Sequence, residues 1–194
     1  MANARAGRPR ASSREVLAEA ACELFLEKGF DATSIADIAN RAGVSRSSFF
    51  NYASSKSGLL WAGFDERAAG LSAIAGASDA SPARPGPAIR SALLAFADGF
   101  RPDALALVFA NAEAMGMAEE LEREAAVRLA RLASTLAALA RRGGADHVLA
   151  DVTGVAYAGA LLTSLRSWAL AGPGTRALSA HLETTLAALA RLPV

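Results

Sequence analysis

A run of one arginine and three serines in the first third of the chain carries side chains suited to recognition chemistry. It comprises Ser45, Arg46, Ser47 and Ser48. A guanidinium can donate two parallel hydrogen bonds to a guanine base, and short hydroxyl side chains reach base edges or phosphate oxygens. If Ser45 caps a helix here, the free backbone N–H groups and the positive dipole end of that helix favour phosphate. The run is therefore typical of a surface that contacts DNA, where Arg46 either reads a base or clamps a phosphate.

Two short predicted helices would position this run. The first begins after Ser34, whose hydroxyl can cap it together with Asp37, and it ends at Gly43. The second spans residues 46–52, and because a helix that short is marginal in water, packing must hold it. A longer helix is predicted before this pair, from residues 12–13 to 28. Two short helices joined by a tight turn with a glycine form a helix-turn-helix arrangement, although any short helical hairpin would share it.

The segment from Thr33 to Tyr52, followed by Ser55 and Lys56, resembles the signature of the tetracycline-repressor (TetR) family. Residues 20–30 are similar to the first helix of the same family. The resemblance implies an all-α fold of about nine helices, with a three-helix helix-turn-helix head before a helical-bundle body. The implied boundaries are a flexible basic arm over 1–11, a DNA-binding domain over 12–56, and a ligand-binding and dimerisation domain over 57–194.

The resemblance also implies a set of DNA contacts. Residues at the start of the second and fourth helices would grip the backbone on either side of the recognition helix, and Tyr52 would add a hydroxyl. The predicted DNA-binding residues are Arg8, Arg10, Thr33, Ser34, Ser45, Arg46, Ser47, Ser48, Asn51, Tyr52 and Lys56. The chain departs from the family pattern at Ala36, Ser47, Phe50 and Ala53. Phe50 and Ala36 offer DNA no polar group, which predicts a thinner set of direct contacts or more reading of DNA shape.

Composition and charge are consistent with this reading. Hydrophobic residues make up 53% of the 194 residues while aromatic residues make up 6%, a mixture that favours packed helices over strands. The net charge of +1 is unevenly spread, because residues 1–14 hold four arginines and no acid. Arginine-rich arms of this kind enter narrow A/T-rich minor grooves. The alternative is a disordered tail without a partner.

Five further helices are predicted in the body after a helix that begins near Lys56. A loop rich in serine, proline and glycine is expected over 76–86. The predicted helices then span 87–100, 102–115, 118–142, 146–170 and 175–191. In the long helix over 118–142, leucine and alanine recur in steps of three and four, and the pair of Glu124 and Arg128 is expected on its exposed side.

The resemblance places several aromatic, methionine and polar residues on helices that would enclose a ligand cavity. The predicted ligand-binding residues are Trp61, Phe64, Phe96, Phe100, Phe109, Asn111, Glu113, Met115 and Tyr157. Aromatic and methionine side chains at helical spacing are also typical of an ordinary core. Because few polar groups belong to this set, the expected effector is a small apolar or aromatic molecule.

Small residues between 152 and 165 would let another helix approach closely. With the last helix, this segment resembles the pair that forms the family's four-helix dimer interface. The predicted interface residues are Val152, Val155, Gly159, Leu162, Leu178, Leu182 and Leu186. Burial within one chain is the alternative. A two-fold dimer would match a palindromic operator.

Several classes of protein are disfavoured. Cys22 is the single cysteine, so an intrachain disulfide is excluded and a reducing cytoplasm is expected. The longest uncharged stretch, over 152–165, is expected to be too short to span a membrane. The two histidines, His147 and His181, lie in separate helices, and no cofactor, metal site or catalytic cluster is expected. The sequence predicts a homodimeric, ligand-responsive repressor; the alternative is a helical adaptor protein with a degenerate DNA-binding head.

Overall fold

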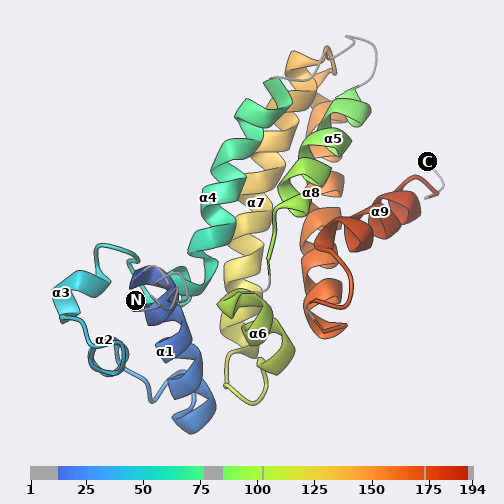
Figure 1. Ribbon diagram of the computed structural model, residues 1–194. Coiled ribbons are helices and arrows are strands. Elements are labelled where there is room, and N and C mark those ends of the chain that lie inside the picture. The colour runs from blue at the N-terminus through green and yellow to red at the C-terminus, as the bar shows by residue number, and fades with distance from the viewer. Residues whose placement is uncertain (1–12, 77–84, 102, 173, 192–194) are drawn as a thin grey trace, which may run out of the picture.

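The computed structural model describes residues 13–76, 85–101, 103–172 and 174–191. These residues form nine helices and no strand, as predicted (Figure 1). The helices are α1 Ser13–Lys28, α2 Ile35–Arg41, α3 Arg46–Phe49, α4 Lys56–Gly76, α5 Pro85–Asp98, α6 Ala104–Asn111, α7 Ala118–Arg142, α8 His147–Leu170 and α9 Leu178–Leu189. The predicted arm over 1–11, with Arg8 and Arg10, lies outside the described residues, as does most of the predicted loop over 76–86.

The first three helices form a small head beside the longer body helices (Figure 1). Its core contains Phe25 from α1, Ile38 from α2 and Phe49 from α3, each with no exposed surface. Gly29 follows the last residue of α1, and Gly43 lies in the turn after α2. Their φ angles are 85° and 69°, in the left-handed region that glycine tolerates best. Short helices with little stability of their own are therefore held by one shared apolar cluster.

Three helices are shorter than predicted. Helix α9 spans Leu178–Leu189, inside the predicted 175–191, and α3 and α6 are shorter for local reasons. Helix α3 ends at Phe49, not at residue 52, because the following N–H groups of Asn51 and Tyr52 turn back to carbonyls three residues earlier. Such bonds tighten the chain into a turn. Helix α6 begins at Ala104 because the Asp103 carboxylate accepts hydrogen bonds from two backbone N–H groups at its start. It ends at Asn111, well before the predicted residue 115.

Helices α7 and α8 pack closely along each other in the body, and α4 runs from the head beside α7 (Figure 1). The contact depends on Gly154 of α8, because a Cβ there would lie 2.3 Å from the carbonyl oxygen of Ala133 on α7. Gly159 has open space where its Cβ would be. Gly154 therefore allows α7 and α8 to pack closely within the chain, and Gly159 has no such role.

Helix α8 is 24 residues long and apolar enough, by length and composition, to cross a membrane. This differs from the expectation for the 152–165 stretch, because the helix extends beyond it at both ends. In the structure, α8 packs against α7, α9 and α6, and Ala158, Leu161 and Leu165 are fully buried. These are the contacts of a core helix.

A chain of aromatic rings fills the body core. Phe64 of α4 lies at the centre, with ring centroids 5.3 Å from Trp61, 5.4 Å from Phe96 and 6.5 Å from Phe100. Phe100 also contacts Trp168 of α8, at 5.7 Å. Edge-to-face contacts at these distances stabilise beyond simple burial. The rings therefore join α4, α5 and α8.

Arg128 of α7 lies inside this core, which corrects its predicted exposed position. The residue is 5% exposed, and its guanidinium donates to both carboxylate oxygens of Asp65 on α4, at 2.9 and 2.7 Å. It also donates to the Glu124 carboxylate and lies 4.3 Å from the Trp61 ring centroid. The side chain that helical spacing assigned to a surface pair therefore fastens α7 to α4.

Candidate DNA-binding surface and ligand cavity

The predicted recognition run lies at the start of α3 and remains accessible. The Ser45 hydroxyl caps α3 by accepting the N–H of Ser48 at 3.1 Å, and it lies 2.8 Å from the hydroxyls of Ser47 and Ser48. Arg46 is exposed, and no ion pair with another described residue holds it. The cluster therefore presents one uncommitted guanidinium next to three linked hydroxyls.

Helix α2 begins with the capping box predicted from Ser34 and Asp37. The Asp37 N–H donates to the Ser34 hydroxyl at 3.1 Å, and the Ser34 N–H donates to Asp37 Oδ2 at 2.9 Å. The Lys28 ammonium also binds this carboxylate at 2.9 Å. Lys28 and then the two groups of Ser34 hold the pKa of Asp37 below its usual range. Ser34 remains exposed at the helix start.

Thr33 is a correction to the predicted DNA-binding set. Its side chain is 1% exposed, and its hydroxyl donates to the carbonyl of Gly29 at 2.8 Å. Its neighbour in space, Lys56, donates to the carbonyls of Phe30 and Thr33 at 2.5 and 2.7 Å, and its ammonium lies 4.0 Å from the Phe30 ring centroid. Partial burial lowers the pKa of Lys56. The Thr33 hydroxyl therefore fastens the α1–α2 turn to the end of α1, and Lys56 fastens it to α4 with one donor left.

The remaining predicted contacts follow the end of α3. Asn51 and Tyr52 are exposed in the turn, and Tyr52 is 40% exposed. Phe50 is 49% exposed, with its ring centroid 5.5 Å from that of the buried Phe49. The surface beside the polar run therefore includes the apolar ring of Phe50, which offers DNA no hydrogen bond.

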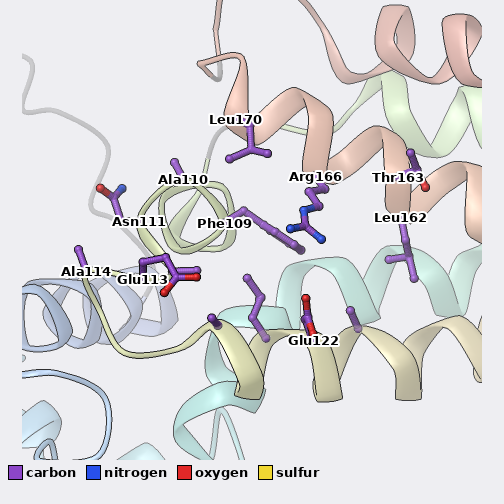
Figure 2. A pocket seen from close by; sticks show the side chains of 14 residues that line it. Phe109, Ala110, Asn111, Glu113, Ala114, Glu122, Leu162, Thr163, Arg166 and Leu170 are labelled. Atoms are coloured by element: carbon purple, nitrogen blue, oxygen red, sulfur yellow. The ribbon is translucent and has the colours of Figure 1, made fainter.

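A cavity of about 520 Å³ lies between α6, the 112–117 segment, α7 and α8 (Figure 2). Its size falls in the range of small-molecule sites. Its lining residues are Phe109, Ala110, Asn111, Ala112, Glu113, Ala114, Ala118, Leu121, Glu122, Ala125, Leu162, Thr163, Arg166 and Leu170. The wall is mostly apolar, with five polar or charged side chains around it.

Three of the predicted ligand-binding residues line this cavity: Phe109, Asn111 and Glu113. The other six do not line it. Trp61, Phe64, Phe96, Phe100 and Met115 are buried in the packed core. Tyr157 is half-buried, with its hydroxyl 3.5 Å from the carbonyl of Gly86, and burial raises its pKa. The large aromatic side chains fill the core of the body, whereas the cavity lies where the wall contains many alanines.

The sequence prediction missed the charged residues that α7 and α8 contribute to the cavity, Glu122 and Arg166. Arg166 is the only charged residue between Asp151 and the end of α8. A single cation in so apolar a helix was a usable signal. The sequence held no comparable signal for Glu122, because it lies among several acidic residues at the start of α7 that are typical of a solvent-exposed face.

The predicted dimer residues separate into two groups. On α8, Val152 and Val155 are 63% and 56% exposed, and with Val148 and Gly159 they follow steps of four and three along one open face. On α9, Leu178, Leu182 and Leu186 are at most 4% exposed and belong to the chain's own core. Their assignment to an interface is therefore wrong. Leu162, three residues after Gly159 on the same stripe, lines the cavity.

Comparison with known proteins relates the head of the chain to a known family. Residues 17–62 match the family model described as bacterial regulatory proteins, tetR family. The chain is 37% identical over 92 residues to the mycofactocin biosynthesis transcriptional regulator MftR of Mycobacterium tuberculosis (strain ATCC 25618 / H37Rv). That alignment covers 47% of this chain and 46% of the relative, so the chain matches about half the length of that protein.

Solved structures resemble the chain over nearly its whole length. The fatty acid degradation regulator FadR from Bacillus halodurans is 16% identical, with a TM-score of 0.50 over 94% of this chain and 96% of that one. Thermus thermophilus FadR, a TetR-family repressor solved in complex with lauroyl-CoA, is 28% identical, with a TM-score of 0.48 over 93% and 95% of the two chains. The first of these similarities establishes the shared all-helical fold. The head of this chain, over residues 17–62, matches the helix-turn-helix domain of the tetR family of bacterial regulatory proteins.

Proposed function

We propose that the chain is a ligand-responsive transcriptional repressor that acts in the cytoplasm and binds a palindromic operator as a homodimer. The observation that carries the proposal is the exposed Arg46, without an ion pair among the described residues and set in a cluster of hydroxyls at the start of α3. An arginine of this kind in a helix-turn-helix domain is free to donate to base edges or phosphates. Ser34, at the start of α2, and the remaining donor of Lys56 would contact the adjacent backbone.

Replacing Arg46 with alanine is expected to weaken operator binding about tenfold to a hundredfold, because one bidentate contact with a base contributes about 1–3 kcal/mol of discrimination. The measurement is a mobility-shift titration against the DNA upstream of the protein's own gene. Arg191→Ala, an exposed arginine at the end of the body, is the matched control and should bind like the unaltered chain.

The salt dependence of the same titration separates DNA recognition from the adaptor alternative. If about six phosphates are neutralised per dimer, the logarithm of affinity should fall with the logarithm of salt concentration with a slope near −5, taking roughly −0.9 per phosphate. If Arg46→Ala and Arg191→Ala lost operator affinity equally, or if affinity did not depend on salt concentration, the result would contradict the proposal and favour an adaptor protein.

The open face of α8 supports the homodimer. Val148, Val152 and Val155 leave exposed apolar surface along several turns of one helix, and Gly159 continues the face with room for close approach. Paired across a two-fold axis, such a face is self-complementary. The axis would then set the spacing of the two α3 helices on two half-sites.

Replacing Val155 with glutamate is expected to convert the dimer to monomers, because the pairing face would bury two uncompensated charges near its axis. Sedimentation equilibrium measures the change, and operator affinity should fall with it. Val127→Glu places the same charge on an exposed position of α7 and serves as the control. A Val155→Glu protein that stays dimeric would show that the pairing face lies elsewhere.

The cavity supports the ligand response through its connection to the head. The 112–117 segment, which supplies Glu113 to the cavity, also accepts a hydrogen bond from the Phe30 N–H at the Met115 carbonyl, at 2.8 Å. Phe30 in turn holds Lys56 at the start of α4. A ligand that favours one arrangement of this segment would shift the population of head positions and lower operator affinity by its differential binding. Helix α4, which begins at Lys56, would transmit this change in head position between the body and the head.

A further inference from the structure

The charges that line the cavity do not cancel. Glu113 and Glu122 contribute two negative charges and Arg166 one positive charge, which leaves one negative charge at neutral pH. Within the ranges that the structure describes, none of the three has an ion-pair partner, and no interaction with the rest of the chain holds them. All three side chains are exposed, so the cavity opens to solvent with a net negative charge that no other described residue neutralises.

The position of these side chains keeps that imbalance in place. Arg166 extends from α8 and Glu122 lies on the facing wall of α7, with Phe109 beside them, whereas Glu113 lies further along, next to Ala114 (Figure 2). If Arg166 turned to pair with Glu122, the Glu113 carboxylate would still lack a counter-charge. No rearrangement of these three residues alone neutralises the cavity.

The aromatic part of the wall also favours a positive ligand. The Phe109 ring is held by an edge-to-face contact with Trp61, at 5.7 Å between centroids, and it also lines the cavity. An aromatic face attracts a cation within about 6 Å of its centroid. Leu121 and Leu162 offer apolar surface to the body of a bound molecule, while the exposed carboxylates remain in contact with water.

We propose that this cavity binds an organic cation with an apolar body, such as an arylalkyl or alkyl amine. The proposal rests on the ligand-responsive function above and names the class of its effector. The ammonium lies between Glu113 and Glu122, and the apolar body packs on Phe109, Leu121 and Leu162. A fatty acid or another anionic amphiphile would instead meet two carboxylates and one guanidinium, so its head group would be repelled overall.

Three probes that differ only in the charge of the head group test the proposal: 4-phenylbutylammonium, 4-phenylbutanol and 4-phenylbutanoate. Binding to the full chain is measured by isothermal titration calorimetry at low salt. The ammonium is expected to bind about fivefold more tightly than the alcohol, and the carboxylate more weakly than the alcohol, given about 1 kcal/mol for a partly exposed charge pair. The preference should shrink as salt is added.

Charge variants locate the binding site. Glu113→Gln and Glu122→Gln should each weaken ammonium binding about threefold to fivefold, and Arg166→Gln should strengthen it by a similar factor. Glu119→Gln, on the same helix as Glu122 but outside the cavity, and Arg176→Gln, an exposed arginine, change the net charge equally and should leave it unaltered.

The possible outcomes distinguish this inference from the function on which it rests. If the carboxylate binds more tightly than the ammonium and Arg166→Gln abolishes that binding, the cavity selects anions and the inference is overturned while the ligand response stands. If the three probes bind equally and the variants have no effect, apolar contact alone selects the ligand, and the inference is again overturned. If no probe binds, both the cation inference and the ligand response lose their site, while DNA binding remains to be judged by Arg46→Ala.

Discussion

Replacing Gly154 with alanine is expected to lower the free energy of unfolding by about 1–2 kcal/mol. The new Cβ would lie 2.3 Å from the Ala133 carbonyl oxygen, 2.9 Å from the Ala137 nitrogen and 3.0 Å from the Ala137 Cβ. Two of these neighbours are backbone atoms of α7, so relief requires the two helices to move apart. Overpacking a core costs about 1–3 kcal/mol, against a gain of about 0.5–1 kcal/mol from replacing glycine within a helix.

Gly159 provides the matched control on the same helix. A Cβ there meets nothing within 4 Å, so Gly159→Ala should gain stability by about 0.5–1 kcal/mol from helix propensity alone. Urea denaturation followed by circular dichroism measures both variants, at one protein concentration because dimerisation contributes to stability. A Gly154→Ala chain as stable as the unaltered one would mean that α7 and α8 are not held at this distance.

Replacing Arg128 with methionine is expected to cost about 2–3 kcal/mol of stability. The change removes a buried guanidinium that donates to Asp65 and Glu124 and lies against Trp61, and it leaves two carboxylates facing each other. Breaking a buried ion pair by removing one partner costs about 3–5 kcal/mol. The side chains of Asp65 and Glu124 are 40% and 26% exposed, so water can partly solvate them and the cost falls below that range.

Arg123→Met is the matched control for this prediction. Arg123 lies on the same helix and pairs with Glu120, but its side chain is 66% exposed, and exposed pairs contribute about 0–1 kcal/mol. Thermal and urea unfolding of the two variants should differ by more than 1 kcal/mol. Equal stability would show that Arg128 contributes no more than a surface pair.

Local signals in the sequence determined much of this protein. Capping at Ser34 and Ser45, glycine at 29 and 43, and the periodic leucines of α7 set the element order, because each depends on residues within one or two turns. The polar run at 45–48 also needed no tertiary information, since its chemistry follows from its side chains and its place at a helix start.

Only the tertiary structure decided which chemically suitable residues are free to act. The Thr33 hydroxyl suits DNA, yet a carbonyl at the end of α1 engages it, and the α1–α2 turn engages two of the three Lys56 donors. Arg128 has surface spacing, yet Asp65 lies where α4 crosses it. Leu178, Leu182 and Leu186 form a stripe that fits a dimer interface or a core, and their burial against the rest of the chain selects the core. Helical periodicity states which side chains share a face, but which helix covers that face depends on contacts between residues far apart in the sequence.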